Sequence, residues 1–347
     1  MKAKIYLCIL LAGCTVCSTS SLFGQDIHFS QFYNTPLILS PALTGMYKGD
    51  LRFSGAYRSQ WNAANSPYRT FHLSADKKFY RVTHTKWWFS GGLSFFYDRA
   101  GDGNLSTTNL SLTGSYTRML NQKNFLTAGA QAGLGQRRFE FGNFTFDNQW
   151  NGDIFDPNRA TNENFNDPSI LYPDFGAGLN WRLQSVKYSN KQRTKLDAGV
   201  GLFHFNQPNQ AFKSNDKIAL PMRWSLYALP SVQVTKKVDL VGGASVQMQG
   251  PNFEALGAAA ARYYISTKTA KEVAVQLGVN FRFNQIGDAM IPAAEIHYRD
   301  WMVGLSWDVN LSGFSTATNH NGGPEITVRY IIHKVYPFGA FKACPLI

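Results

Sequence analysis

The stretch GGPEITVRYII, residues 322–332, decides the fold, because it alternates lipophilic with polar side chains after a glycine-rich turn. Successive side chains of a β-strand point to opposite faces, so Ile326 and Tyr330 share one face. The other face carries the charges of Glu325 and Arg329. Such charges are costly in an apolar core but are well solvated in a watery lumen. This pattern is typical of a transmembrane β-barrel strand.

The same alternation recurs along the whole chain. Runs of period two, bounded by turn residues, predict fourteen strands. Most runs have 10 to 14 residues, a length that fits a tilted strand crossing a hydrocarbon layer of about 25–30 Å. We therefore expect an all-β, transmembrane, antiparallel up-and-down barrel of about 14 strands, with both termini on the periplasmic side. The runs lie near residues 51–61, 69–79, 87–98, 105–119, 125–138, 172–184, 195–205, 222–233, 239–249, 253–265, 272–283, 290–299, 301–310 and 324–334.

Aromatic residues favour a membrane barrel over a soluble sandwich, whose strands also alternate between a polar and an apolar face. Membrane barrels carry girdles of aromatic residues where the wall meets the two interfaces. Aromatic side chains fall at or near many predicted strand ends: Tyr57, Trp61, Phe79, Trp87, Trp88, Tyr97, Trp181, Trp224, Trp301 and Trp307.

The N-terminus has the pattern of an export signal, with basic residues 1–4 followed by a short apolar run. Two processing sites compete, a lipobox-like stretch at residues 11–14 and a signal-peptidase site near Gly24. The second is favoured, because the first leaves residues 15–24 as an unexplained tether. No other run approaches the roughly 20 apolar residues of a membrane-spanning helix, so a membrane-embedded form of this chain must be a closed barrel.

Three parts follow from this reading: a signal peptide, an N-terminal plug or periplasmic segment, and the barrel. Residues 26–45 carry several large apolar side chains, Phe29 and Phe32 among them, and are too apolar to remain free in water. We expect them to pack at the periplasmic mouth or inside the barrel. The three parts comprise residues 1–24, 25–49 and 50–347.

Charge and cysteine content narrow the possible partners. The formal net charge of +12 falls to +10 without Lys2 and Lys4, a balance compatible with nucleic acid or anionic lipid. The export signal, and the lack of a basic helix or an RNA-binding signature, argue against nucleic acid. Three of the four cysteines lie in the predicted signal peptide, which leaves Cys344 and no intramolecular disulfide.

Charged residues on the second face of the predicted strands are expected to line the lumen as a network of ion pairs. Buried ion pairs contribute modest net stability, but removal of one partner costs roughly 3–5 kcal/mol. The predicted lumen-lining residues are Arg52, Arg58, Asp76, Arg282, Glu295, Arg299, Asp308, Glu325 and Arg329.

Motifs of enzymes are missing from the sequence. A hydrolase would need a nucleophile with a base in reach, yet Gly-x-Ser-x-Gly is absent and the histidines lack metal-ligand spacing. The most catalytic-looking set is Glu295, His297 and Arg299, which alternate on one strand face. Every other strand also sends polar residues inward, so we interpret this set as lumen lining. We expect no enzymatic activity, no cofactor and no small-molecule substrate.

Connections between the predicted strands differ in length and charge. The long outer connection, residues 139–171, is acidic and rich in asparagine, whereas the inner turns are short and basic. These basic turns are either simply solvated or form a positive periplasmic rim that docks an acidic partner or lipid headgroups. The candidate docking residues are Lys187, Lys191, Arg193, Lys236 and Lys237.

Several segments, in order and at consistent spacing, resemble one known family. They are DIHFSQFYNTP (26–36), SPALTG (40–45), YRSQW (57–61), GVGLFHFNQPNQ (199–210), GDAMIPA (287–293) and WDVNLS (307–312). Together they resemble the PorP/SprF family, outer-membrane components of the type IX secretion and gliding machinery in Bacteroidota. The resemblance spans essentially the whole mature chain.

This resemblance implies an integral outer-membrane β-barrel that helps to export or display cargo with C-terminal sorting domains, often surface adhesins. The partners that it implies are outer-membrane lipid, other type IX secretion components and the secreted cargo proteins. The alternative function is a passive porin or a channel for hydrophobic solutes, because barrels of this size can be open or plugged.

Overall fold

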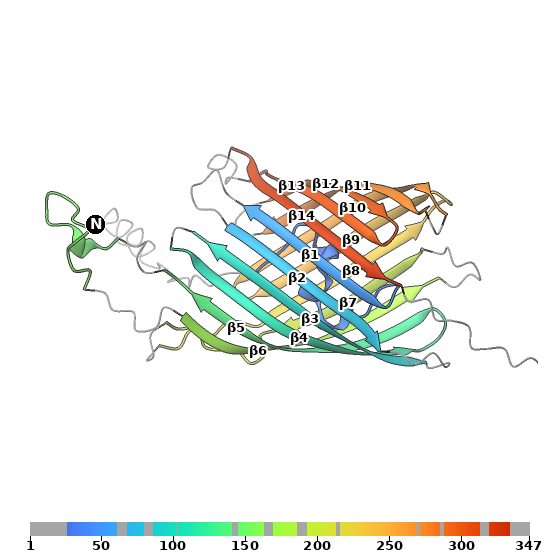
Figure 1. Ribbon diagram of the computed structural model, residues 1–347, viewed down its shortest axis with the longest axis horizontal. Helices are drawn as coiled ribbons and strands as arrows, with labels where there is room; N and C mark the ends of the chain where they lie inside the picture. Colours follow the sequence, from blue (N-terminus) through green and yellow to red (C-terminus); the bar gives the residue numbers. More distant parts are fainter. Residues whose placement is uncertain are drawn as a thin grey trace, which may run out of the picture.

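A computed structural model describes eleven stretches of the chain: residues 26–60, 68–79, 86–101, 103–140, 145–162, 169–185, 193–212, 216–268, 271–284, 288–312 and 319–333. Fourteen strands form one closed antiparallel barrel, in which each strand pairs with its neighbours in sequence and β14 pairs with β1 (Figure 1). The predicted all-β up-and-down barrel is therefore confirmed. None of the described helices is long and apolar enough to span a membrane.

Each predicted run of alternating residues corresponds to one strand, and the differences are confined to strand ends. The sixth strand begins at Ser169, ahead of the predicted residue 172, and the seventh ends at Phe203, before residue 205. The strands are β1 Leu51–Gln60, β2 Tyr68–Phe79, β3 Trp87–Ala100, β4 Leu105–Met119, β5 Asn124–Arg138, β6 Ser169–Gln184, β7 Lys195–Phe203, β8 Arg223–Gln233, β9 Val238–Gln249, β10 Asn252–Ser266, β11 Val273–Asn284, β12 Ala289–Tyr298, β13 Trp301–Asn310 and β14 Asn321–Ile332.

The wall of the barrel is apolar outside and polar inside. On β14 the outward Ile326 is 43% exposed, whereas the inward Glu325 and Thr327 are fully buried. Leu112 and Leu171 are each 67% exposed on the outside. Apolar surface in water costs about 25 cal/mol per Å², so an exterior of this kind is stable only against lipid.

The two ends of the barrel differ. At one end, which we call the outer end, lie the long connections 139–168 and 204–222, and the first of these contains the short helix η5 (Asp147–Gln149). At the opposite, inner end β1 begins, β14 ends, and short turns such as residues 234–237 join the strands. Outer-membrane barrels have short periplasmic turns and longer extracellular loops. By this pattern we expect the inner end to face the periplasm.

Residues 26–50, which we call the N-terminal segment, occupy the lumen, where Figure 1 shows them in blue behind the wall. The segment forms three short helices: η1 (Phe32–Asn34), α2 (Pro36–Leu39) and η2 (Pro41–Leu43). Its apolar side chains make the protein's core. One cluster joins Phe32, Leu39, Leu43 and Met46 to Tyr227 and Leu256 of the wall.

The segment runs the length of the lumen. At the outer end the N–H of Asp26 donates to Gln249 Oε1 at 2.8 Å. At the inner end the N–H of Asp50 donates to the carbonyl oxygen of Ile332 at 2.9 Å. Of the two predicted locations, the periplasmic mouth or the lumen, the structure places the segment in the lumen.

Glycines in the wall provide room for the segment. An added Cβ on Gly129 of β5 would lie 2.4 Å from Ala42 N, and one on Gly201 of β7 would lie 2.3 Å from Leu39 O. Both neighbours are backbone atoms, which cannot move aside as a flexible side chain could. The segment therefore rests directly against the strand backbones at these two positions.

An arginine introduced on the lipid-facing surface should destabilise the barrel more, the closer it lies to the middle of the bilayer. Leu277→Arg, in the middle of β11, should lower the free energy of unfolding by about 2–4 kcal/mol, whereas Phe283→Arg, near the outer end of the same strand, should cost about 0–1 kcal/mol. Both side chains are more than half exposed on the same face. The folded band on semi-native gels over a urea series measures both costs. Equal costs would contradict a lipid-facing exterior.

Candidate functional site: the filled lumen

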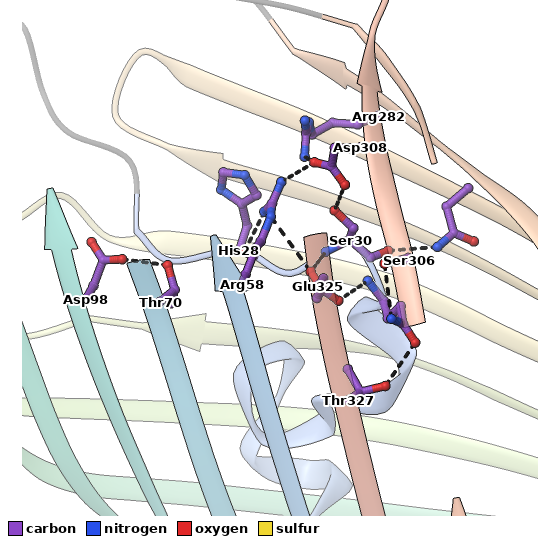
Figure 2. Close-up of polar contacts among 12 residues, drawn as sticks. His28, Ser30, Arg58, Thr70, Asp98, Arg282, Ser306, Asp308, Glu325 and Thr327 are labelled. Atoms are coloured by element: carbon purple, nitrogen blue, oxygen red, sulfur yellow. Dashed lines mark hydrogen bonds and ion pairs between the residues drawn. The ribbon is translucent and has the colours of Figure 1, made fainter. Parts of the chain in front are cut away.

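Arg58, on the inner face of β1, binds the N-terminal segment and the wall together (Figure 2). Its Nη1 donates to the carbonyl oxygen of His28 at 2.7 Å, and its Nη2 donates to Asp308 Oδ2 at 2.6 Å. Asp308, on β13, also accepts from Arg282 Nη1 at 2.8 Å and from Ser30 Oγ at 2.7 Å. One buried carboxylate thus joins three strands to the segment.

Glu325, on β14, holds the backbone of the segment. Its two carboxylate oxygens accept the N–H groups of Ser30 at 2.7 Å and Gln31 at 2.8 Å (Figure 2). Arg58 Nε lies 3.7 Å from Glu325 Oε2, and both side chains are at most 1% exposed. Two hydrogen bonds from successive backbone N–H groups to one buried carboxyl group leave little freedom, so Glu325 fixes the turn that precedes η1.

Amide side chains of η1 and its preceding turn continue this network. Gln31 Nε2 donates to Ser306 Oγ at 3.1 Å, and Thr327 Oγ1 donates to Gln31 Oε1 at 2.9 Å. Asn34 Nδ2 donates to Glu295 Oε1 at 2.9 Å. The turn and η1 are therefore bound to β12, β13 and β14, the last three strands of the chain.

Two arginine–aspartate pairs hold the inner half of the segment. Arg52 of β1 forms a bidentate pair with Asp76 of β2, at 2.8 and 2.9 Å, and donates from Nη2 to the carbonyl oxygen of Leu43 at 3.1 Å. Arg182 of β6 pairs with Asp197 of β7 at 2.6 and 2.8 Å. Its Nη2 also donates to the carbonyl oxygen of Met46 at 2.6 Å. In each pair the arginine therefore binds both its aspartate and a backbone carbonyl of the segment.

His204 fixes the outer end of the segment. Its Nε2 lies 2.6 Å from Asp26 Oδ2 and its Nδ1 lies 2.7 Å from Asp174 Oδ1. Arg223 Nε approaches Asp26 Oδ2 to 3.3 Å. Burial lowers the pKa of His204, but the charge of Asp26 and the hydrogen bonds to both carboxylates outweigh it and raise the pKa to about 9. His204 is therefore cationic at neutral pH.

The structure brings most of the predicted lumen-lining residues together inside the barrel, and Arg329 is half-buried there. Sequence reasoning missed Arg182, Asp197 and His204. The signal for the first two was available, because both alternate with apolar residues in predicted strands. The inward, buried residues of the predicted set are Arg52, Arg58, Asp76, Arg282, Glu295, Asp308 and Glu325.

Arg299 does not line the lumen, contrary to prediction. The strand β12 ends at Tyr298, and Arg299 lies exposed in the two-residue turn to β13 with a left-handed φ of +55°. Short hairpin turns need such a conformation, which breaks the alternation of the strand. Only two members of the catalytic-looking set therefore meet, with His297 Nε2 at 2.9 Å from Glu295 Oε2.

The predicted docking residues have different environments. Lys187 and Lys191 lie outside the described residues, as do the predicted signal peptide and Cys344. Arg193 binds residues of the barrel wall. Its Nε and Nη2 donate to the two carboxylate oxygens of Asp239 at 2.7 and 2.9 Å, and its Cζ lies 4.1 Å from the ring centroid of Tyr264. Two candidates, Lys236 and Lys237, are exposed in the turn between β8 and β9.

Residues 21–330 match the family described as type IX secretion system membrane protein PorP/SprF. This chain belongs to the PorP/SprF family. Membership confirms the resemblance seen in the sequence, and together with the closed barrel and its apolar exterior it makes the chain an outer-membrane β-barrel of type IX secretion. No curated protein matches this chain.

Solved structures of similar fold include two hydrocarbon channels and an autotransporter domain. The CymD monoaromatic hydrocarbon channel is 11% identical, with a TM-score of 0.49 over 90% of this chain and 96% of CymD. The TodX deltaS2S3 mutant channel is 10% identical, with a TM-score of 0.47 over 86% of this chain and 94% of TodX. The β domain of the Bordetella autotransporter BrkA is 12% identical, with a TM-score of 0.37 over 82% and 99%.

Deleting residues 26–45 from this PorP/SprF protein should open its lumen, because the segment supplies both the apolar core and the ligands of Arg58 and Glu325. Planar-bilayer recordings should show little steady current from the full chain and a clear increase from the deletion. Asp308→Ala should give an intermediate result, since loss of one partner of a buried ion pair costs roughly 3–5 kcal/mol.

Asp300→Ala is the matched control, because that carboxylate is 40% exposed in an inner turn and does not touch the segment's anchors. Heat-modifiable migration on a semi-native gel verifies that each variant still forms the barrel. A large, stable conductance from the full chain would contradict a filled lumen and favour a solute channel.

Raising the pH should weaken the outer anchor of the PorP/SprF segment. The pKa of His204 is about 9 in the folded protein, against an ordinary value of 6.5. Its stabilisation is therefore complete below pH 6.5 and is lost as the pH rises through about 9. The free energy of unfolding should exceed that of His204→Gln by roughly 3 kcal/mol at pH 6.

Urea unfolding followed by tryptophan fluorescence at pH 6, 8 and 10 measures this difference. It should shrink at pH 8 to 10. A difference that stays constant over this range would show that His204 acts without its charge.

Proposed function

We propose that this barrel is a closed docking component of type IX secretion, which supports export or surface display of cargo such as adhesins without conducting solutes itself. The observation that carries the proposal is the N-terminal segment, which fills the lumen and is anchored along its length. A partner must then engage the protein at its ends or on its wall. The lumen serves to hold the segment.

The filled lumen argues against the porin alternative. A porin leaves an aqueous channel lined by polar residues. Here Phe32 and Leu39 lie in the lumen and are each 1% exposed, and the charged residues of the wall bind the backbone of the segment. Neither group is available to line a water-filled path.

Charge on the two ends supports docking at the periplasmic end. Exposed lysines occupy four of the described inner connections, whereas the long outer connection has exposed aspartates at residues 147 and 153. A charged rim raises the encounter rate with a partner of opposite charge. We propose that the inner lysines bind an acidic surface of a secretion component or of cargo. These lysines are Lys86, Lys123, Lys236, Lys237, Lys268 and Lys271.

We also infer that the barrel is not an enzyme. The titratable groups inside it bind one another or the segment, as Glu295 does with His297 and Asn34. His72, which is fully buried, lies 3.1 Å from the hydroxyl of Ser94 through its Nε2. In the described part of the chain, the pair of His28 and Glu254, 3.6 Å apart, does line a hollow near the outer end. Its volume of about 20 Å³ holds a water molecule but no organic substrate.

Reversing two inner lysines should reduce docking. Lys236→Glu with Lys237→Glu should lower co-purification of secretion components, and surface display of cargo, several-fold. The effect should weaken in high salt, because exposed charges are screened beyond about 8–10 Å at ordinary ionic strength. Pull-down in mild detergent and surface labelling of intact cells provide the two measurements.

Lys217→Glu is the matched control, since this exposed lysine lies in an outer connection. It should leave periplasmic docking unchanged. Unaltered co-purification and display in the double variant, with the barrel still heat-modifiable, would place the docking surface elsewhere.

A further inference from the structure

Three arginines lie in one row on the outside of the barrel, near its outer end. Arg69 of β2 stands opposite Arg99 of β3, Arg99 stands opposite Ser106 of β4, and Ser106 stands opposite Arg138 of β5. All three arginine side chains are exposed. We call Arg69, Arg99 and Arg138 the arginine row.

The register shows where this row lies relative to the apolar exterior. One step toward the middle of the barrel, the outward residues are Tyr97, Thr108 and Gln136, which are paired in register. A further step brings Phe95, Leu110 and Leu134 into the next row, and Leu110 and Leu134 are each about half exposed. Two residues along a strand span roughly 7 Å. The arginine row therefore begins where the lipid-facing apolar surface ends, at the level of lipid headgroups.

Side chains of these rows enclose a polar hollow of about 240 Å³ on the barrel's outer surface. Its lining includes Arg99, Arg138, Ser106 and Thr108, together with the acidic Glu140. Two arginines and two hydroxyl-bearing residues around one hollow supply donors of the kind that bind a phosphate group.

The positive charge of the row is only partly compensated. Arg69 and Arg99 stand directly opposite each other, and like charges in cross-strand positions are destabilising. Arg99 Nε donates to the neutral Asn104 Oδ1 at 2.7 Å, and Asn104 in turn donates to Glu140. Among the residues described in this region, three positive charges therefore face the one carboxylate of Glu140. An anion in the hollow would relieve this repulsion.

The row is confined to one side of the barrel. Among the described strand residues, charged side chains that face outward near the outer end occur only on β2, β3 and β5. Elsewhere on the wall the outward residues near this end are apolar or aromatic, and they include Tyr57, Trp224, Met248, Phe253, Phe283, Met290, Trp307 and Pro324.

We propose that the arginine row binds the phosphate group of a lipid headgroup in the outer leaflet, with the acyl chains lying on the apolar rows next to it. Arg99 and Arg138 bind the phosphate oxygens from two sides, and the hydroxyls of Ser106 and Thr108 complete the site. The two halves of an amphiphile match two adjoining parts of the wall, whereas inorganic phosphate would use only one. A lipid held here is fixed to β2–β5 and leaves the rest of the wall free.

Binding of a diphosphorylated glycolipid to the full-length protein in detergent tests this proposal, with native mass spectrometry as the readout. The variant Arg99→Gln with Arg138→Gln should bind at least about tenfold more weakly, because it loses two charge-assisted contacts. The control Lys77→Gln with Arg118→Gln removes exposed basic residues from β2 and β4 near the inner end. It should bind like the unaltered protein.

Two further probes separate the sources of the anion. The same lipid without its phosphates should bind weakly, and inorganic phosphate at millimolar concentration should not displace the phosphorylated lipid. Displacement by inorganic phosphate would overturn the proposal in favour of a free-anion site, and equal binding of the dephosphorylated lipid would reduce the contact to apolar packing. Unchanged lipid binding in the double variant would also overturn it. Arg138→Gln alone, with weaker expected loss, serves if the double variant does not fold.

Discussion

Every backbone N–H and C=O group at membrane depth must be paired within the protein, and the rest of the structure depends on this constraint. The wall satisfies it because β1 and β14 pair over eight residue pairs, from Leu51 with Ile332 to Arg58 with Glu325. Closure then determines the two faces. Outward side chains at membrane depth meet lipid and must be apolar, so the strands place most of their polar side chains in the lumen.

A lumen lined by ionised groups must be filled by water or by protein, because an unpaired charge in a dry interior is strongly destabilising. Here the N-terminal segment fills it, and the division of roles is consistent along its length. Wall charges bind the segment's backbone: Glu325 accepts N–H groups, and the arginines donate to carbonyl oxygens, as Arg182 does to Met46. The segment's apolar side chains pack among themselves and against Tyr227 and Leu256. The wall of the barrel is thus apolar outside and polar inside, and the N-terminal segment supplies most of an apolar core within it.

Alternation in the sequence was enough to predict the strands, their number and the inward direction of residues such as Arg58 and Asp308, because side-chain direction in a strand depends only on parity. The prediction was wrong for Arg299, where a left-handed turn residue ends the alternation. Partners could not be predicted. Ser30 and Glu325 are 295 positions apart, and their contact depends on closure of the whole wall. His204 was missed because the predicted run 195–205 includes it, whereas β7 ends at Phe203 and His204 has a left-handed φ of +56°, so that the alternation no longer gives its direction.

Closure of the wall and seating of the segment are two aspects of one event. The groups that hold the turn before η1 come from β13 and β14, and those strands complete the barrel by pairing with β1. Without the segment, Glu325 would lose both N–H donors while it remained buried beside Arg58. Without closure, the segment would expose Phe29 and Phe32 to water. Closure of the wall therefore buries the segment's apolar side chains, and the segment satisfies the buried carboxylate of the wall. This mutual dependence explains how a short segment with only three short helices is held inside the barrel.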